Sequence, residues 1–190
     1  MSTADVILLR FPGKATQEQY KEVKALAGGA GATGARGYGN ADETLIYFDL
    51  GSPQEVRPDA MSALADKASG LLGGARVSGA ALKQVSDLKG ASAGFPAPVH
   101  YVVEMDFAPA GADELSRWYA QEHLPGLSSV TGSVRSRRYV SESGRSHACY
   151  DLVSSLVPET PEWMKWRDTD WTRRVREHHR NMKRGIFLAL

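Results

Sequence analysis

Hydrophobic and polar positions alternate along this chain in a pattern that predicts strands and helices in one repeated order. Residues 6–11 form a short apolar run typical of a buried strand, and a helical pattern follows over about 16–27. The same order returns later, with a strand over 99–107 and a helix over 113–123. Acidic residues open that second helix and a Pro-Gly pair at 125–126 follows it, as expected for the two ends of a helix.

The remaining elements also correspond in pairs. In each half an aromatic-Asp-Leu strand leads through a Pro-containing turn into a helix, and a further strand closes the half. The first-half elements are a Gly-broken strand at 31–39, a strand at 45–50, a helix at 58–70 and a strand at 75–85. Their second-half counterparts are a strand at 133–141, a strand at 148–152, a helix at 160–181 and a strand at 184–190.

Each half therefore has the order β-α-β-β-α-β, which is that of the ferredoxin-like unit. We predict an α+β protein with two fused ferredoxin-like halves, a tandem form of the dimeric α+β barrel. Residues 1–90 form the first half and a barrel wall, residues 97–190 form the second half and carry the site, and the Gly-rich stretch 89–96 links them. Two unrelated halves with similar patterns are the alternative, and the barrel could close within one chain or between two.

Side chains alternate across a strand, so the strand at 99–107 sorts its residues onto two faces. One face is uniformly large and apolar, and we expect it to lie under helices: Tyr101, Val103, Met105 and Phe107. The opposite face includes His100 and Glu104, which would project into a barrel interior. Titratable groups in an apolar cavity are costly unless they pair or have a chemical role. This pattern favours a site in the second half, unless both residues lie on an open solvent face.

Trp118, Tyr119, Glu122 and His123 lie together at the end of the helix predicted over 113–123. Tyr119 and His123 are four residues apart and so share one helix face. Together they could exchange a proton with a substrate, because the pKa of His lies near working pH. The structural alternative is that the aromatic pair packs in the core and that the terminal His caps carbonyl groups.

The second half contains the runs WYAQEHLP at 118–125, TG at 131–132 and RRY at 137–139. These runs resemble the EthD-like branch of the dimeric α+β-barrel superfamily, and residues 163–172 resemble a later helix of the same group. The first half matches in topology only, since Tyr20 stands near the position of Trp118 but no Glu-His pair follows it. The resemblance implies the fold. It also implies a superfamily of cofactor-free cyclases, isomerases, lyases and monooxygenases, together with haem-binding enzymes, and leaves the reaction open.

Composition excludes several classes of protein. The 23 Lys and Arg residues nearly balance the 22 Asp and Glu residues, which argues against a nucleic-acid binder. A single cysteine, Cys149, excludes an intramolecular disulfide and a Cys-rich metal site. No run approaches the ~18 apolar residues of a membrane span, and the first residues do not resemble a signal peptide. We therefore expect a cytoplasmic protein without a membrane partner.

Three further patterns have weaker chemical interpretations. Residues 29–34 match GxGxxG, but a helix precedes them and a strand follows, the reverse of a dinucleotide site. The basic residues over 173–184 are typical of a solvated helix face, with contact to an anionic substrate as the alternative. A metal held by His100, Glu104 and His123 ranks behind acid–base use of the same residues. We predict neither a metal nor a cofactor.

The sequence thus favours a cofactor-independent lyase, isomerase or cyclase that acts on a small hydrophobic, aromatic or polyketide-like compound. The predicted catalytic residues are His123, which transfers the proton, and Tyr119 and Glu104, either of which could orient it. The predicted substrate contacts are His100, Trp118, Arg138, Tyr150 and Trp171. The alternatives are a monooxygenase, cofactor-free or haem-dependent, and a non-catalytic small-molecule-binding or stress-response protein. Exposed sheet edges in this fold are often covered by dimerisation, so we expect a homodimer.

Overall fold

The computed structural model describes residues 3–190 and divides the chain into two compact units. The first unit comprises Met1–Gln84 with Phe187–Leu190, and the second comprises Val85–Ile186. Residues 1 and 2 lie outside the described residues. They are the first residues of the predicted first half and of the N-terminal segment that we compared with signal peptides. Within the described part of the chain, no helix is both long and apolar enough to cross a membrane.

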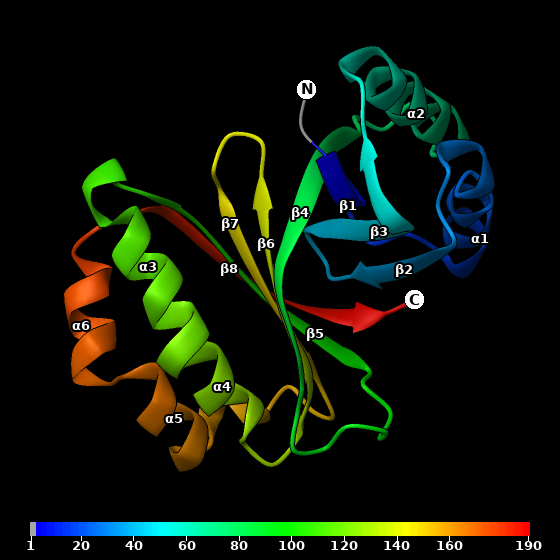
Figure 1. The fold of residues 1–190 in the computed structure, drawn as a ribbon. Helices are drawn as coiled ribbons and strands as arrows, with labels where there is room; N and C mark the ends of the chain where they lie inside the picture. Colours follow the sequence, from blue (N-terminus) through cyan, green and yellow to red (C-terminus); the bar gives the residue numbers. More distant parts are fainter. Residues whose placement is uncertain (1–2) are drawn as a thin grey trace. The chain divides into compact units, whose positions relative to one another are not determined.

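The first half has the expected order of elements (Figure 1). Its strands and helices are β1 (Thr3–Pro12), α1 (Gln17–Ala25), the 3-10 turn η1 (Gly28–Ala30), β2 (Gly34–Gly39), β3 (Glu43–Glu55), α2 (Pro58–Leu71) and β4 (Ser78–Lys89). Strand β1 pairs antiparallel with β3 and β4, and β2 pairs with β3, so the strand order is β4-β1-β3-β2. Helices α1 and α2 lie on one face of this sheet (Figure 1).

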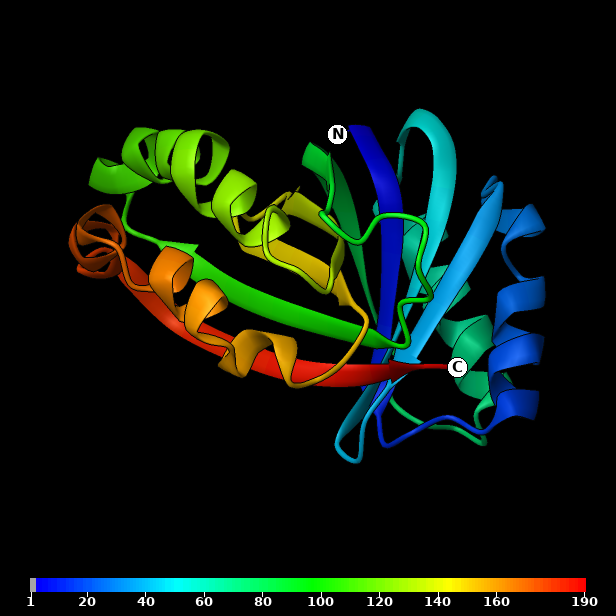
Figure 2. The ribbon, with the colours of Figure 1, turned by 90° about the horizontal axis from the view of Figure 1, so that it is seen from below.

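The second half repeats the order with more interruptions in its helices. Its elements are β5 (Val99–Phe107), η2 (Pro109–Gly111), α3 (Ala112–Trp118), the π-helical turn η3 (Tyr119–His123), α4 (Leu124–Ser128), β6 (Ser133–Ser141), β7 (Ser146–Leu152), η4 (Val157–Glu159), α5 (Pro161–Arg167), α6 (Asp170–Arg176) and β8 (His179–Ala189). The strand order is β8-β5-β7-β6, the counterpart in topology of the first half. Helices α3 to α6 cover one face of this sheet (Figure 2).

Both halves are thus ferredoxin-like, and the predicted α+β fold class is confirmed. The long strands β4 and β8 have residues in both units, so the division by compactness differs from the division by element order. For example, Leu188 and Ala189 at the end of β8 pair with β2.

Each unit has its own apolar core between its helices and its sheet. In the first, Leu9, Ile46 and Phe48 of the sheet pack with Val23 of α1 and Ala68 of α2. The second core is more aromatic, and its buried members include Trp118, Tyr119, Tyr150 and Trp163. The apolar face of β5 packs against this second core, as its alternation predicted, through Tyr101, Val103, Met105 and Phe107.

Three sequence predictions are wrong in detail. The helix expected over 160–181 is two helices, because Thr160 and Thr169 each cap a new one with their side chains, and β8 then begins at His179. The helix expected to end at Pro125-Gly126 continues to Ser128. Residues Ser52-Pro53, expected in a turn, belong to β3, whose first pairing with β1 is irregular between Ala4 and Val6.

Candidate active site

The second unit contains a small cavity between its helices and its sheet, which we call the helix-face cavity. Its volume is about 30 Å³. Its wall is mainly aromatic and is formed by Trp118, Tyr119, Tyr101, Tyr150 and Trp163. His123 also lines it, and its rim carries the basic residues Arg167, Arg176, His179 and Arg184. Cysteine does not line it, since Cys149 has the opposite strand parity to Tyr150.

The π-helical turn over Tyr119–His123 decides which side chains meet here. The amide of Leu124 bonds to the carbonyl of Tyr119, five residues back. In an ordinary α-helix, side chains five residues apart diverge by about 140°, because each residue turns ~100°. Here the rings of Trp118 and His123 instead stack, with centroids 4.0 Å apart and planes 24° from parallel. Such turns are rare and occur frequently at functional sites.

The Leu-Pro-Gly sequence after His123 accounts for this local geometry. Pro125 has no amide hydrogen and cannot close an α-helical bond. A Cβ on Gly126 would lie 2.3 Å from the ring of Trp166, so only glycine permits this approach. The backbone of Trp166 in turn forms a hydrogen bond with the imidazole of His123. The motif therefore brings α5 close enough to orient His123.

His123 is buried, and burial lowers its pKa to about 3 because the imidazolium would lose its hydration. The nearby charges of Arg176, His179 and Arg184 lower the pKa further, whereas the hydrogen bond that the imidazole donates to the Trp166 backbone carbonyl raises it. Nδ1 of His123 has no hydrogen-bond partner among the described residues. The bond to the Trp166 backbone raises the pKa of His123, so the imidazole is its donor. Because Nδ1 has no partner, we assign the donated N–H to Nε2, which leaves the lone pair on Nδ1. The cavity thus presents a neutral proton acceptor.

Tyr119 remains protonated at ordinary pH, because burial raises its pKa to about 12. The guanidinium of Arg138 lies over its ring, 4.6 Å from the centroid, and Arg138 Nε donates to Ser146 Oγ at 3.0 Å. Burial also lowers the pKa of Arg138. Arg138 therefore lies behind Tyr119 and not in the wall of the helix-face cavity, so it would act on a substrate there only through Tyr119.

A chain of hydroxyl contacts holds Trp118 and Glu122 against α6. Trp118 Nε1 donates to Thr172 Oγ1 at 3.1 Å, and the hydroxyls of Thr172 and Thr169 are 2.9 Å apart. Thr169 then donates to a carboxylate oxygen of Glu122. The Glu of the Trp-Tyr-x-x-Glu-His sequence therefore ties two helices together, while its His faces the cavity.

His100 and Glu104 lie on the other face of the sheet from His123. His100 Nδ1 is 2.7 Å from Asp151 Oδ1, and Arg137 donates to the second oxygen of that carboxylate. Glu104 Oε1 is 2.8 Å from His147 Nδ1 across the β5–β7 pair. All five side chains are buried. We call this set the buried polar cluster.

This arrangement corrects two predictions. Glu104 pairs with His147 and does not orient His123, and His100, Glu104 and His123 do not come together around a metal. Among residues 3–190, no group of three His, Cys, Asp or Glu side chains is placed to hold a metal ion. The physical reason is strand parity: the helix-covered face belongs to Tyr101 and Val103, and their neighbours His100 and Glu104 point away from it.

Of the other predicted site residues, Trp118, Tyr119 and Tyr150 do line the cavity with His123. Trp171 does not; its indole donates to Glu114 Oε1 at 3.2 Å and packs at the margin of the core. The sequence reasoning missed the rim formed by Arg167, Arg176, His179 and Arg184. The signal for Arg176, His179 and Arg184 was the basic run over 173–184, which was interpreted as a solvated helix face with contact to an anionic substrate as the alternative. Arg167 lies outside that run.

No protein-family model matches the chain, and no curated protein sequence matches it. Solved structures do match over its whole length. An anthrone oxidase-like protein is 14% identical, with a TM-score of 0.60, covering 100% of this chain and 92% of its own. A ferredoxin-fold protein from Listeria monocytogenes, related to antibiotic biosynthesis monooxygenases, is 12% identical, with a TM-score of 0.58 and coverages of 97% and 95%.

A third match is a haem-degrading enzyme from Listeria monocytogenes, 9% identical, with a TM-score of 0.58, covering 95% of this chain and 98% of that one. At these identities the likeness establishes the fold. This chain has the ferredoxin-like fold of proteins related to antibiotic biosynthesis monooxygenases.

Proposed function

We propose that this protein is an oxygen-dependent enzyme of the monooxygenase type that oxidises a small, enolisable aromatic compound at the helix-face cavity. Similar solved structures include an anthrone oxidase-like protein and a haem-degrading enzyme, which favour oxidation over the lyase or isomerase chemistry expected from sequence. Membership in the EthD-like branch is part of the proposal and is supported by the run WYAQEHLP at 118–125. The homodimer and the cytoplasmic location stay predictions.

One observation carries the proposal: the neutral, buried His123 lines an aromatic cavity, and its Nδ1 has no hydrogen-bond partner among the described residues. A base with a pKa near 3 is weak in the free enzyme. A substrate that becomes an anion as it loses its proton supplies the countercharge that the cavity lacks, so the imidazolium forms only together with that anion. This requirement selects substrates with a stabilised conjugate base, such as phenols, which form phenolates, and anthrones. The CH₂ group of an anthrone gives a carbanion that reacts with O₂.

The reaction balances without an added reductant. His123 Nδ1 accepts a proton from the activated CH₂ group, and the substrate carbanion then transfers electrons to O₂ and forms a C–O bond. Loss of water, to which the His123 proton returns, gives the ketone: R₂CH₂ + O₂ → R₂C=O + H₂O. The substrate supplies all four electrons. Tyr119, which stays protonated, and the stacked Trp118 fix the plane in which the reacting edge enters.

The size of the cavity limits what can enter. A volume of about 30 Å³ admits O₂ or the reacting edge of a flat substrate, while the substrate's body would lie over the half-exposed rim that includes Met182 and Arg184. A haem macrocycle does not fit this volume, and Trp118, Tyr119 and Trp163, which would have to move, are fully buried. The residues present therefore do not form a haem site here, and no step is assigned to haem.

Oxygen uptake tests the proposal directly. The purified protein is mixed with 1,8-dihydroxyanthrone, and O₂ consumption is followed with an electrode while anthraquinone formation is followed by absorbance. We expect one O₂ consumed per quinone formed, above the rate in buffer, and a loss of at least ~100-fold in kcat for His123→Gln. His178→Gln, whose residue does not line the cavity, is the matched control.

Two outcomes would contradict it. Undiminished turnover by folded His123→Gln would remove His123 from the reaction. Conversion of an enolisable aromatic substrate without O₂ uptake would show that the enzyme is a lyase or isomerase that uses the same proton acceptor.

A further inference from the structure

The first unit contains a much larger cavity, of about 480 Å³, between α1, η1 and α2 on one side and strands β1 and β3 on the other. We call it the first-half cavity. Its volume lies within the range of ~300–1,000 Å³ that is typical of sites for small molecules. All of its lining residues belong to the first unit, and Figure 1 shows the two helices that border it.

Small side chains account for this space. On α2 the lining residues are Ala60, Met61, Ala63, Leu64 and Lys67. Apart from Met61 they are spaced i, i+3, i+4 and i+7, which is one helix face. On the facing side, Ala25, Gly29 and Ala30 contribute little volume. The floor is apolar and buried, with Ile7 of β1 and Leu50 of β3. Ala25, Ala60 and Ala63 are exposed, so this space opens to solvent and a ligand can enter it.

The described lining residues are of types that bind a ligand through apolar contact and charge, and they do not include the usual proton-transfer or nucleophilic side chains. Among the described residues that line this cavity, none is a histidine, cysteine or tyrosine. The polar lining residues are Gln54, Glu55, Arg57 and Lys67. The Arg57 guanidinium is occupied by Asp59, with bonds of 3.0 and 2.9 Å. Lys67, ten residues further along α2, makes no hydrogen bond or ion pair with the described residues.

Asp59 offsets the charge of Arg57, so Lys67 is the cationic group among the described lining residues that is left to meet an anion. The lining face of α2 is apolar from Ala60 to Leu64 and ends at the cationic Lys67. From Ala60 to Lys67 it extends over seven residues, or about 10 Å of helix. A molecule that matches this surface has an apolar body of similar length and one anionic group that reaches Lys67. We propose that the first-half cavity binds a small apolar monocarboxylate of the medium-chain fatty acid type.

Decanoate is the probe, and isothermal titration calorimetry on the full chain is the measurement. Ala63→Phe fills the cavity and is expected to weaken decanoate binding at least 10-fold. Ser62→Phe adds the same ring at the neighbouring exposed position, which does not line the cavity, and should leave binding unchanged. Circular dichroism verifies that both variants fold.

Charge reversal tests the anionic group. Lys67→Glu should weaken decanoate binding several-fold and leave decanol binding unchanged, whereas Lys21→Glu, an exposed position of α1 outside the cavity, should change neither. Equal decanoate affinity in Ala63→Phe and wild type would overturn the site. Equal affinity of wild type for decanol and decanoate would overturn the carboxylate class. Neither result depends on turnover at His123, so this proposal and the proposed function fail separately.

Discussion

The two halves of this chain share one topology and differ in what lies between helices and sheet. In the first half that space is a cavity of about 480 Å³ with small aliphatic walls, and in the second it shrinks to about 30 Å³ between aromatic rings. Tyr20 of α1 and Trp118 of α3 are both buried, each in the first helix of its half. The ring of Tyr20 packs so closely on Gly37 that a Cβ on Gly37 would lie 2.3 Å from it. The same order of elements therefore leaves a large cavity with small aliphatic walls in one half, and a small aromatic cavity lined by His123 in the other.

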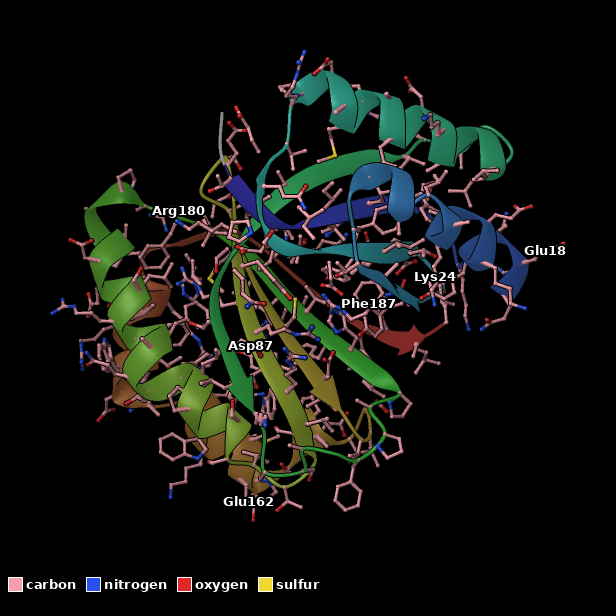
Figure 3. All side chains as sticks on the ribbon, turned by 45° about the vertical axis from the view of Figure 1, so that its right-hand side comes forward. Glu18, Lys24, Asp87, Glu162, Arg180 and Phe187 are labelled. Carbon is pink, nitrogen blue, oxygen red and sulfur yellow. The ribbon has the colours of Figure 1, made fainter. Side chains whose placement is uncertain are left out.

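The two halves also differ in the side chains that they bury. Charged and reactive side chains are buried mainly in the second unit, with His123 under the helices and the buried polar cluster on the other sheet face. In both halves the helices carry charged residues on their outer surfaces. Glu18 on α1 and Glu162 on α5, for example, point outward (Figure 3). Function is therefore a property of the interior side chains and not of the fold.

The largest expected effect compares packing in the two halves. Trp163 is fully buried in the second core, so Trp163→Ala should lower the free energy of unfolding by ~3–5 kcal/mol. Leu64 borders the first-half cavity and already lacks neighbours on one side, so Leu64→Ala should cost only ~2 kcal/mol. Urea unfolding followed by circular dichroism measures both. Equal losses would mean that the first-half cavity is as well packed as the second core.

A pair of helical glycines should respond in opposite directions. Gly126→Ala forces a Cβ to within 2.3 Å of the Trp166 ring and should destabilise the protein by ~1–3 kcal/mol. Gly70, in α2, has no atom within 4 Å of the position that an added methyl group would take. Gly70→Ala should therefore stabilise the protein by ~0.5–1 kcal/mol, because the unfolded chain loses conformational entropy. Thermal unfolding curves of the two variants test this. A neutral Gly126→Ala would show that Trp166 can move away from His123 at little cost.

The smallest expected effect, counted per pH unit, is the decrease in unfolding free energy that His123 of the second half causes as the pH falls. The pKa of His123 is lowered to about 3 in the folded protein, against ~6.5 when unfolded, so the unfolded chain binds the additional proton between these values. Stability from this group is therefore complete above pH 6.5 and falls as pH drops toward 3, by at most ~1.4 kcal/mol per unit. His179, with a pKa lowered to about 4, acts in the same direction.

Denaturant unfolding between pH 7 and 4 measures this slope. His123→Gln should reduce the slope of unfolding free energy against pH by up to the contribution of one bound proton. His178→Gln serves as the control. The same pKa predicts that kcat/KM does not fall between pH 8 and 5 through protonation of His123. A fall with a midpoint near 6.5 would show that His123 is exposed to water in the working enzyme.

Much of the fold was predictable because its signals are local. Period-2 alternation placed β5 and its apolar face, and the Thr16 and Pro58 helix starts follow ordinary end signals. The candidate site was predictable in part: His123, Tyr119, Trp118 and Tyr150 do line one cavity. His179 was not placed there, because a helix was expected to run to residue 181, whereas Thr169 caps a new helix that ends at Arg176. Arg184, at the start of the strand predicted over 184–190, was interpreted as part of a solvated basic run.

By itself, the sequence determined the order of elements, the helix-covered face of β5 and the segment in which His123 lies. Those properties depend on neighbours within a few residues, through backbone propensity and side-chain alternation. Only the tertiary structure decided that Glu104 pairs with His147, that Trp118 stacks on His123, and that small residues of α1 and α2 leave a cavity. These features depend on strand register and helix docking, which join residues far apart in the chain, and no local pattern predicts them.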